Sequence, residues 1–91
     1  MNNYDVMVIG GGVIGTSVAY HLCKKGFKVA LVERGDIASG TSSHCDAVAL
    51  ICDKNPGIDT EMGYASILRY KELQEELSYD FEFHQRGCLY V

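Results

Sequence analysis

Residues 4–15 read Tyr-Asp-Val-Met-Val-Ile-Gly-Gly-Gly-Val-Ile-Gly, and this stretch decides the fold. The run over 4–9 is apolar, rich in β-branched residues and stopped by glycine, which is typical of a parallel strand buried on both faces. Glycines at positions 10, 12 and 15 follow the pattern G-x-G-x-x-G. The pattern has weight here because it stands directly after a predicted strand and opens a predicted helix.

The residues that follow complete one structural unit. From Val13 to Lys25 apolar side chains recur at helical spacing, and Gly26 is predicted to end that helix in the left-handed conformation. Residues 27–32 form a second β-rich run, and Glu33 stands at its end. The fold class predicted for this third of the chain is therefore α/β, a Rossmann-like βαβ unit.

Each part of the motif has a physical reason. Gly10 permits the strand-to-helix turn, Gly12 lets a pyrophosphate approach the backbone, and Gly15 lets helix and strand pack closely. The helix N-terminus offers N–H groups and a partial positive charge to phosphates. Glu33, 18 residues after Gly15, is expected to bind ribose hydroxyls and to repel a 2′-phosphate. FAD or NAD is thus expected rather than NADP, and a glycine-rich turn without nucleotide is the alternative.

Composition excludes several classes of protein. The 91 residues allow one small domain at most. Twelve acidic residues stand against eight basic ones, with a net charge of -4, so no nucleic acid partner is expected. Residues 6–23 carry no charge and raise the question of a membrane span. Four glycines between positions 10 and 15 favour a strand, a turn and a helix instead, so no integral membrane segment is predicted.

The four cysteines are Cys23, Cys45, Cys52 and Cys88, and no two of them form a C-x-x-C pair. Zinc-ribbon and redox-dithiol sites are therefore not indicated, and no metal is expected. The N-terminus lacks the basic region of a signal peptide. Free thiols in a reducing compartment, with a cytoplasmic location, are the prediction.

The second half of the chain has a different texture. Residues 39–46 are small and polar and are predicted to form a functional loop or a turn that approaches a phosphate. A helix is expected over 59–78 and one or two strands over 81–91. Because an apolar strand end without a partner strand is a liability, the chain is expected to be a piece of something larger.

Residues 8–15, with Gly26 and the stretch 29–34, resemble the FAD-binding fingerprint of the D-amino acid oxidase-like flavoproteins. That family includes glycine oxidase, sarcosine oxidase and dehydrogenase, and dimethylglycine dehydrogenase. Residues 39–44 resemble the family's second flavin-contacting loop, and 85–91 resemble the stretch where its substrate domain begins. The resemblance implies that residues 1–80 are the N-terminal part of an FAD-binding domain. Residues 81–91 would begin an antiparallel substrate-domain sheet.

The resemblance implies FAD contacts in three places. The glycine motif would contact the pyrophosphate, the end of the second strand would hold the adenosine ribose, and the polar loop would lie against the pyrophosphate or the flavin. The residues are Gly10, Gly11, Gly12, Val13, Ile14, Gly15, Glu33, Arg34, Thr41, Ser42, Ser43 and His44. The chain departs from many relatives at Asp46 and Ala47, where they have a small residue followed by glycine.

His44 has two interpretations. Residues 40–44 resemble a G-[ST]-[ST]-x-H stretch whose histidine carries the flavin covalently in dimethylglycine and sarcosine dehydrogenases. Ser43 stands where those proteins usually have tryptophan. A polar loop histidine near the flavin ring, without a covalent bond, is the alternative.

The resemblance implies an FAD-dependent oxidoreductase that oxidises the C–N bond of an amino acid or secondary amine by hydride transfer to flavin. Its expected partners are FAD, a small amine or amino acid, and the remainder of the chain or a partner subunit. No residue here is a credible general acid or base, so the catalytic residues are unknown. Two alternatives stay open: a non-catalytic small subunit or truncated remnant, and an NAD-binding module of a dehydrogenase.

Overall fold

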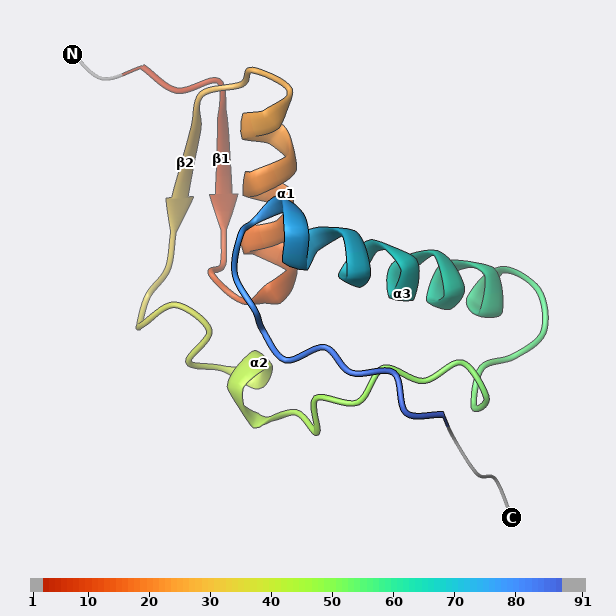
Figure 1. Ribbon diagram of the computed structural model, residues 1–91. Helices are drawn as coiled ribbons and strands as arrows, with labels where there is room; N and C mark the ends of the chain where they lie inside the picture. The colour runs from red at the N-terminus through yellow and green to blue at the C-terminus, as the bar shows by residue number, and fades with distance from the viewer. Residues whose placement is uncertain (1–2, 88–91) are drawn as a thin grey trace. The chain divides into compact units, whose positions relative to one another are not determined.

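The computed structural model describes residues 3–87 of the chain. They fall into two compact units, residues 1–46 and residues 47–91. The units are described one at a time below, and the elements carry the labels of Figure 1.

The first unit is a βαβ arrangement, as predicted from the glycine motif. Strand β1 (Val6–Ile9), helix α1 (Val13–Lys24) and strand β2 (Val29–Val32) follow one another along the chain. The strands pair in parallel, in a register that joins Val6 to Val29 and Ile9 to Val32. Gly10 extends the ladder by donating its N–H to the Val32 carbonyl at 2.8 Å. Both strands are shorter than the apolar runs that predicted them.

The end of α1 confirms the stop signal at Gly26. This glycine has a φ of +93° and donates its N–H to the Cys23 carbonyl at 3.0 Å. Phe27 donates to the Leu22 carbonyl at 3.1 Å. The two bonds form a Schellman motif, which satisfies the last carbonyls of the helix and turns the chain back into β2.

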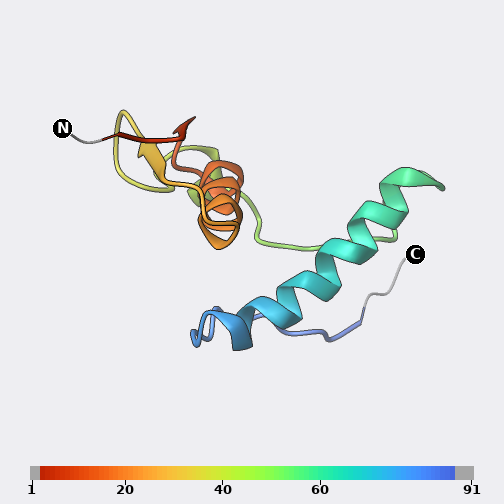
Figure 2. The ribbon, with the colours of Figure 1, turned by 90° about the horizontal axis from the view of Figure 1, so that it is seen from above.

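One face of the sheet is covered and the other is open within this unit. Helix α1 contacts both strands and lies on the face that carries Val8 (Figure 2). On the opposite face Met7 is 64% exposed and Ile9 is 83% exposed. The prediction that the first strand is buried on both faces is therefore wrong for the described residues. The reason is that one helix supplies only one covering layer.

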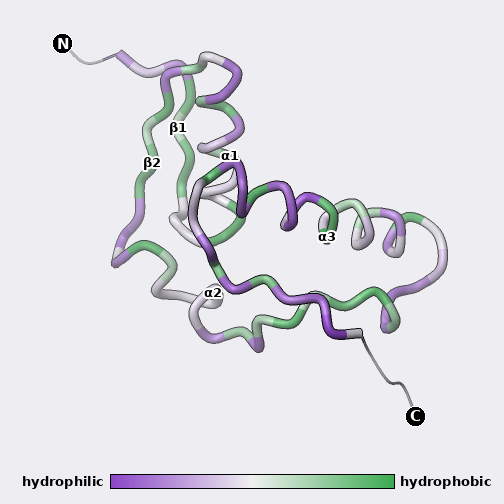
Figure 3. The backbone as a smooth tube through the Cα atoms, viewed as in Figure 1, coloured by the Kyte–Doolittle hydropathy of each residue, from purple (hydrophilic) through white to green (hydrophobic). Residues whose placement is uncertain are grey.

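No hydrophobic side chain of residues 3–87 is fully buried. Apolar residues nevertheless concentrate along β1 and β2, as Figure 3 shows. Units of this size have too much surface for their volume to enclose side chains completely. Close packing in the first unit is achieved between backbones instead, at the glycine motif.

The second unit is organised by helix α3 (Ile58–Glu76), close to the predicted 59–78. Gly57, with a φ of +102°, precedes the helix. On the polar side of α3 the Arg69 guanidinium pairs with Glu72 at 3.2 Å and with Glu76 at 3.1 Å. These half-exposed pairs contribute modestly, since solvent screens them.

The strands predicted over 81–91 are not found in residues 81–87, and residues 88–91 lie outside the described part of the chain. Side chains of α3 hold this segment in place of a neighbouring strand. Phe83 donates its backbone N–H to Gln74 Oε1 at 3.0 Å. The Tyr70 ring stacks on Phe83 at 5.5 Å and meets Phe81 edge-on at 6.1 Å. An alternating apolar pattern can thus be satisfied by a helix as well as by a sheet.

Candidate functional site

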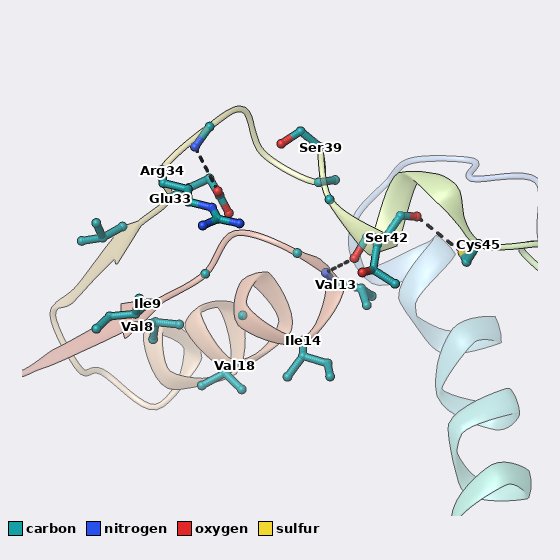
Figure 4. A pocket seen from close by; sticks show the side chains of 18 residues that line it. Val8, Ile9, Val13, Ile14, Val18, Glu33, Arg34, Ser39, Ser42 and Cys45 are labelled. Atoms are coloured by element: carbon teal, nitrogen blue, oxygen red, sulfur yellow. Dashed lines mark hydrogen bonds between the residues drawn. The ribbon is translucent and has the colours of Figure 1, made fainter.

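A cleft of about 1150 Å³ opens at the carboxyl ends of β1 and β2 (Figure 4). Three segments of the first unit meet there: the glycine-rich turn with the first residues of α1, the residues after β2, and the polar stretch 38–45. That stretch contains α2 (Thr41–His44), a single helical turn where the sequence predicted a loop or a turn. This location is where open α/β sheets bind ligands.

The glycine-rich turn is built without room for side chains. Gly10 has a φ of +112°, which only glycine adopts at low cost. A Cβ placed on Gly15 would collide with the Gly10 carbonyl oxygen and would lie 2.9 Å from its carbon. The same Cβ would lie 3.6 Å from Val8 Cγ1. The close packing of helix on strand predicted for Gly15 is thus confirmed.

The Glu33 carboxylate anchors the turn from the end of β2. Gly11 donates its N–H to Glu33 Oε2 at 2.7 Å, and Gly35 donates to Oε1 at 3.0 Å. These two backbone bonds hold the pKa of Glu33 below its ordinary value, with a smaller contribution from the charge of Arg34. Glu33 is therefore an anion at neutral pH, and its oxygens retain lone pairs for further donors.

The Ser42 hydroxyl lies at the N-terminus of α1. Val13 donates its N–H to Ser42 Oγ at 2.9 Å, a bond that joins residues 29 apart in the chain. A Cβ on Gly12 would lie 2.9 Å from the same oxygen. The first turn of α1 carries no acidic residue. The partial positive charge of this helix end is thus offset by no carboxylate of its own.

The neighbours of Ser42 in α2 make only local bonds. The Ser43 hydroxyl donates to the Gly40 carbonyl at 3.0 Å, and His44 Nδ1 lies 2.7 Å from the same carbonyl. A carbonyl oxygen only accepts, so this contact favours the tautomer with the proton on Nδ1. Nε2 is then the nitrogen of His44 that keeps a lone pair.

The structure brings most of the sequence-predicted residues to one cleft. Nine of the twelve line it: Gly10, Gly12, Val13, Ile14, Gly15, Glu33, Arg34, Thr41 and Ser42. Gly11, Ser43 and His44 do not. Gly11 is buried. Its carbonyl oxygen accepts a hydrogen bond from the Ala38 N–H at 2.9 Å, and its own N–H is donated to Glu33. The part each residue plays toward a ligand stays a prediction.

Nine further residues line the cleft that were not named singly as cofactor contacts: Val8, Ile9, Val18, Val32, Gly35, Ala38, Ser39, Gly40 and Cys45. Ser39 and Gly40 belong to the polar stretch that was singled out as a loop, so composition carried that signal. Val18 stands four residues beyond Ile14 on α1, and the i, i+4 spacing puts it on the same helix face as that predicted residue. The apolar residues of β1 and β2 carry no signal of ligand binding, because apolar side chains are typical of strands whether or not a ligand lies nearby.

Two other findings bear on the candidate site. A second cleft of about 530 Å³ lies within the other unit, between the segments 47–52 and 82–87, and none of the twelve predicted residues lines it. Among residues 3–87, no helix is both long and apolar enough to cross a membrane.

Comparison with known proteins agrees with the geometry. The sequence model of the family described as "FAD dependent oxidoreductase" matches residues 5–91. The chain is 42% identical over 93 residues to "Glycine oxidase" of Bacillus licheniformis, an alignment that covers 94% of this chain and 25% of that protein. It is 39% identical over 87 residues to the human "Dimethylglycine dehydrogenase, mitochondrial", which covers 93% of this chain and 10% of that protein.

A third relative carries a different kind of name. The chain is 32% identical over 86 residues to the mouse "Pyruvate dehydrogenase phosphatase regulatory subunit, mitochondrial", covering 93% of this chain and 10% of that protein. The chain therefore spans a quarter or less of the length of these relatives.

Proposed function

The chain belongs to the family of FAD-dependent oxidoreductases, and on this premise we propose that its first unit holds the ADP half of FAD. The observation that carries the proposal is the cleft at the ends of β1 and β2. There the helix N-terminus, the glycine turn and an ionised carboxylate converge. The sequence motif alone left both FAD and NAD open as ligands. FAD is preferred here because it is the cofactor of the family.

The residues present fit a dinucleotide. Gly12 has no side chain, and a Cβ there would lie only 2.9 Å from Ser42 Oγ; a backbone without side chains lets phosphate oxygens approach its N–H groups. Glu33 is fixed by Gly11 and Gly35 through backbone bonds, and its remaining lone pairs suit ribose hydroxyls. The cleft, at about 1150 Å³, exceeds the usual range of small-ligand pockets, roughly 300–1,000 Å³.

The residues take distinct parts in this proposal. Gly10, Gly12, Val13 and Gly15 lie along the pyrophosphate, with Ile14 beside them. Glu33 and Arg34 hold the ribose. Thr41 and Ser42 approach the phosphates from α2, while Gly11 acts from behind by orienting the turn. When bound, FAD would accept a hydride from the substrate. The chain's own residues would bind and orient the cofactor.

The proposed reaction is oxidation of the C–N bond of a small amino acid or secondary amine. The names of the relatives support this class, since one is a glycine oxidase and another a dimethylglycine dehydrogenase. Residues 1–80 are proposed to form part of the FAD-binding domain, and residues 81–91 to lead into the substrate domain. The rest of the catalytic site is proposed to come from further chain or a partner subunit. Cytoplasmic location stays a prediction.

A non-catalytic role is the second candidate. It is favoured by the likeness to a protein named as a regulatory subunit. In that case FAD or the nucleotide fold alone would stabilise an assembly, and no amine would be oxidised. The two candidates agree on the cleft and differ on what happens after the flavin is bound.

The test uses the full-length protein, purified with its flavin. Glycine, sarcosine and dimethylglycine are added in turn without oxygen, and the flavin absorbance is followed. Loss of the oxidised-flavin band with one of these amines supports the proposed reaction. Bound flavin that none of them reduces favours the non-catalytic role, and a protein that takes up no flavin refutes the proposed reaction and leaves only a non-catalytic role of the nucleotide fold.

Acid precipitation of the same protein decides the question about His44. A covalent bond to His44 is established if the flavin stays with the precipitated wild-type protein but is released on precipitation of the His44→Ala variant. Flavin that is released entirely refutes it.

A further inference from the structure

The second cleft has one apolar wall and one charged wall, both supplied by the second unit. The apolar wall is segment 47–51, in which every residue is apolar. The charged wall is segment 82–87, which carries the acidic side chain of Glu82 and the basic side chain of Arg86. At about 530 Å³ the cleft lies within the usual range of small-ligand pockets, roughly 300–1,000 Å³.

Helix α3 holds the charged wall in position. Phe83, which stands between the two charged residues in the chain, donates its N–H to Gln74 at 3.0 Å and stacks on the Tyr70 ring. Phe83 is half-buried, whereas Glu82 and Arg86 are exposed. The backbone of this wall is therefore anchored to the helix, and its charged side chains stay accessible to solutes.

The two charges are not paired within the described part of the protein. Among residues 3–87, neither the Glu82 carboxylate nor the Arg86 guanidinium forms an ion pair or a side-chain hydrogen bond. Arg69 of the same unit shows the contrast, because two glutamates of α3 pair with it. Glu82 and Arg86 thus line one cleft without neutralising each other, and a ligand in the cleft can use both.

A small zwitterion fits such a cleft. An α-amino acid carries a carboxylate and an ammonium group on one carbon atom, so it requires a cation and an anion within one small space. A guanidinium can donate two parallel N–H bonds to a carboxylate, and a carboxylate accepts hydrogen bonds from an ammonium group. An apolar wall suits N-methyl groups, because removing them from water is favourable. A simple acid or a simple amine would leave one charge of the cleft unused.

We propose that the second cleft binds glycine or an N-methylated glycine, with the carboxylate of the ligand at Arg86 and its ammonium group at Glu82. The choice of these amino acids rests on the proposed function, since the names of the relatives supply them. His84 stands between the two charged residues in the chain and lines the same cleft, where its ring can donate a further hydrogen bond to the carboxylate. Each unit would then carry one binding site, the first for FAD and the second for the amino acid.

Calorimetric titration of the flavin-stripped, full-length protein with glycine and with dimethylglycine tests the proposal. Arg86→Gln and Glu82→Gln each remove one charge and should weaken binding about 10-fold, the effect of one lost charge-assisted hydrogen bond. Lys71→Gln and Glu75→Gln on α3 are the matched controls, because they remove the same charges outside both clefts. Solvent screens such distant surface charges, so the controls should change Kd less than about 2-fold. Circular dichroism checks that each variant is folded.

Single-charge probes test the need for both groups. Acetate and methylamine each carry half of the glycine molecule and should bind about 10-fold more weakly than glycine, or weaker still. Acetate that binds as tightly as glycine would overturn the proposal, because the ammonium group would then have no partner. Glycine binding that Arg86→Gln and Glu82→Gln leave unchanged would overturn it too, and so would the absence of binding by both amino acids.

Failure of the cleft and failure of the proposed reaction give different results. If both variants weaken glycine binding but no amine reduces the flavin, the cleft is supported and the reaction is refuted. If an amine reduces the flavin with a KM that Arg86→Gln and Glu82→Gln leave unchanged, the reaction is supported and the cleft is refuted.

Discussion

Gly15→Ala is the sharpest perturbation of the nucleotide turn. A Cβ there meets the backbone of Gly10, collides with its oxygen and lies 2.9 Å from its carbon. Because backbone atoms are at stake, no side chain can rotate away. Reaching ordinary contact at about 3.4 Å requires α1 to move by roughly 0.5 Å or more, and overpacking of this kind costs about 1–3 kcal/mol.

Helix propensity predicts the opposite sign, since alanine exceeds glycine by about 1 kcal/mol inside a helix. Because the obstacle is rigid backbone, we take the upper end of the overpacking cost and subtract the gain in helix propensity. The free energy of unfolding should then fall by about 2 kcal/mol. The assay is urea-induced unfolding of the full-length protein, followed by flavin release and by circular dichroism. Flavin release should move to lower urea, and affinity for FAD should fall.

Gly63→Ala is the matched control, because it makes the same substitution inside α3. Its Cβ would find its nearest atoms at 3.9 Å, an ordinary contact. This variant should gain up to about 1 kcal/mol from helix propensity. If the two variants shift stability in the same direction, the close approach of α1 to Gly10 is refuted.

Three further perturbations follow from named contacts. Glu33→Gln should weaken flavin binding. Wild-type protein should release flavin when the pH is lowered, and the variant should lack this pH dependence. The Glu33 pKa lies below its ordinary 4.5, so the carboxylate contributes fully to flavin binding above pH 4.5, and this contribution is lost as the pH falls through the lowered pKa. If the pH dependence of flavin fluorescence is the same in Glu33→Gln as in wild type, this reasoning is contradicted. Gly12→Ala fills the opening beside Ser42 and should weaken FAD binding about 10-fold or more, measured by titration of stripped protein; Kd within twofold of wild type would exclude that role. Gln74→Ala removes the acceptor of the Phe83 N–H and should speed tryptic cleavage after Arg86 several-fold, whereas Gln74→Glu, which keeps an oxygen, should not.

The βαβ unit was predictable because its signals are local. An apolar run, a glycine turn, helical spacing and the stop at Gly26 each act within a few residues, and the structure contains all of them. The position of Glu33 was predictable for the same reason, since it follows directly from the end of β2. Local signals also explain why the helix over 59–78 was placed to within two residues of α3.

The parts that sequence missed depend on contacts between distant residues. The alternation in residues 81–87 suited a strand, and nothing in the pattern revealed that Tyr70 and Gln74 of α3 would take its place. The glycine pattern likewise did not reveal that the Gly11 N–H is donated to Glu33, which lies 22 residues further along the chain. Burial on both faces of β1 presumed a second layer that residues 3–46 do not supply.

The glycine motif specifies an opening, and the polar side chains specify what fills it. Backbone N–H groups without partners are costly, so the N–H groups of such a turn need acceptors from elsewhere in the chain. Glu33 and Ser42 supply these, from positions 22 and 29 residues away along the chain. The two side chains differ in charge. Glu33 brings an anion that accepts from two backbone N–H groups, whereas Ser42 brings a neutral hydroxyl that accepts from Val13 at the start of α1. The turn is therefore held by side chains from distant parts of the chain, which the glycine pattern by itself does not specify.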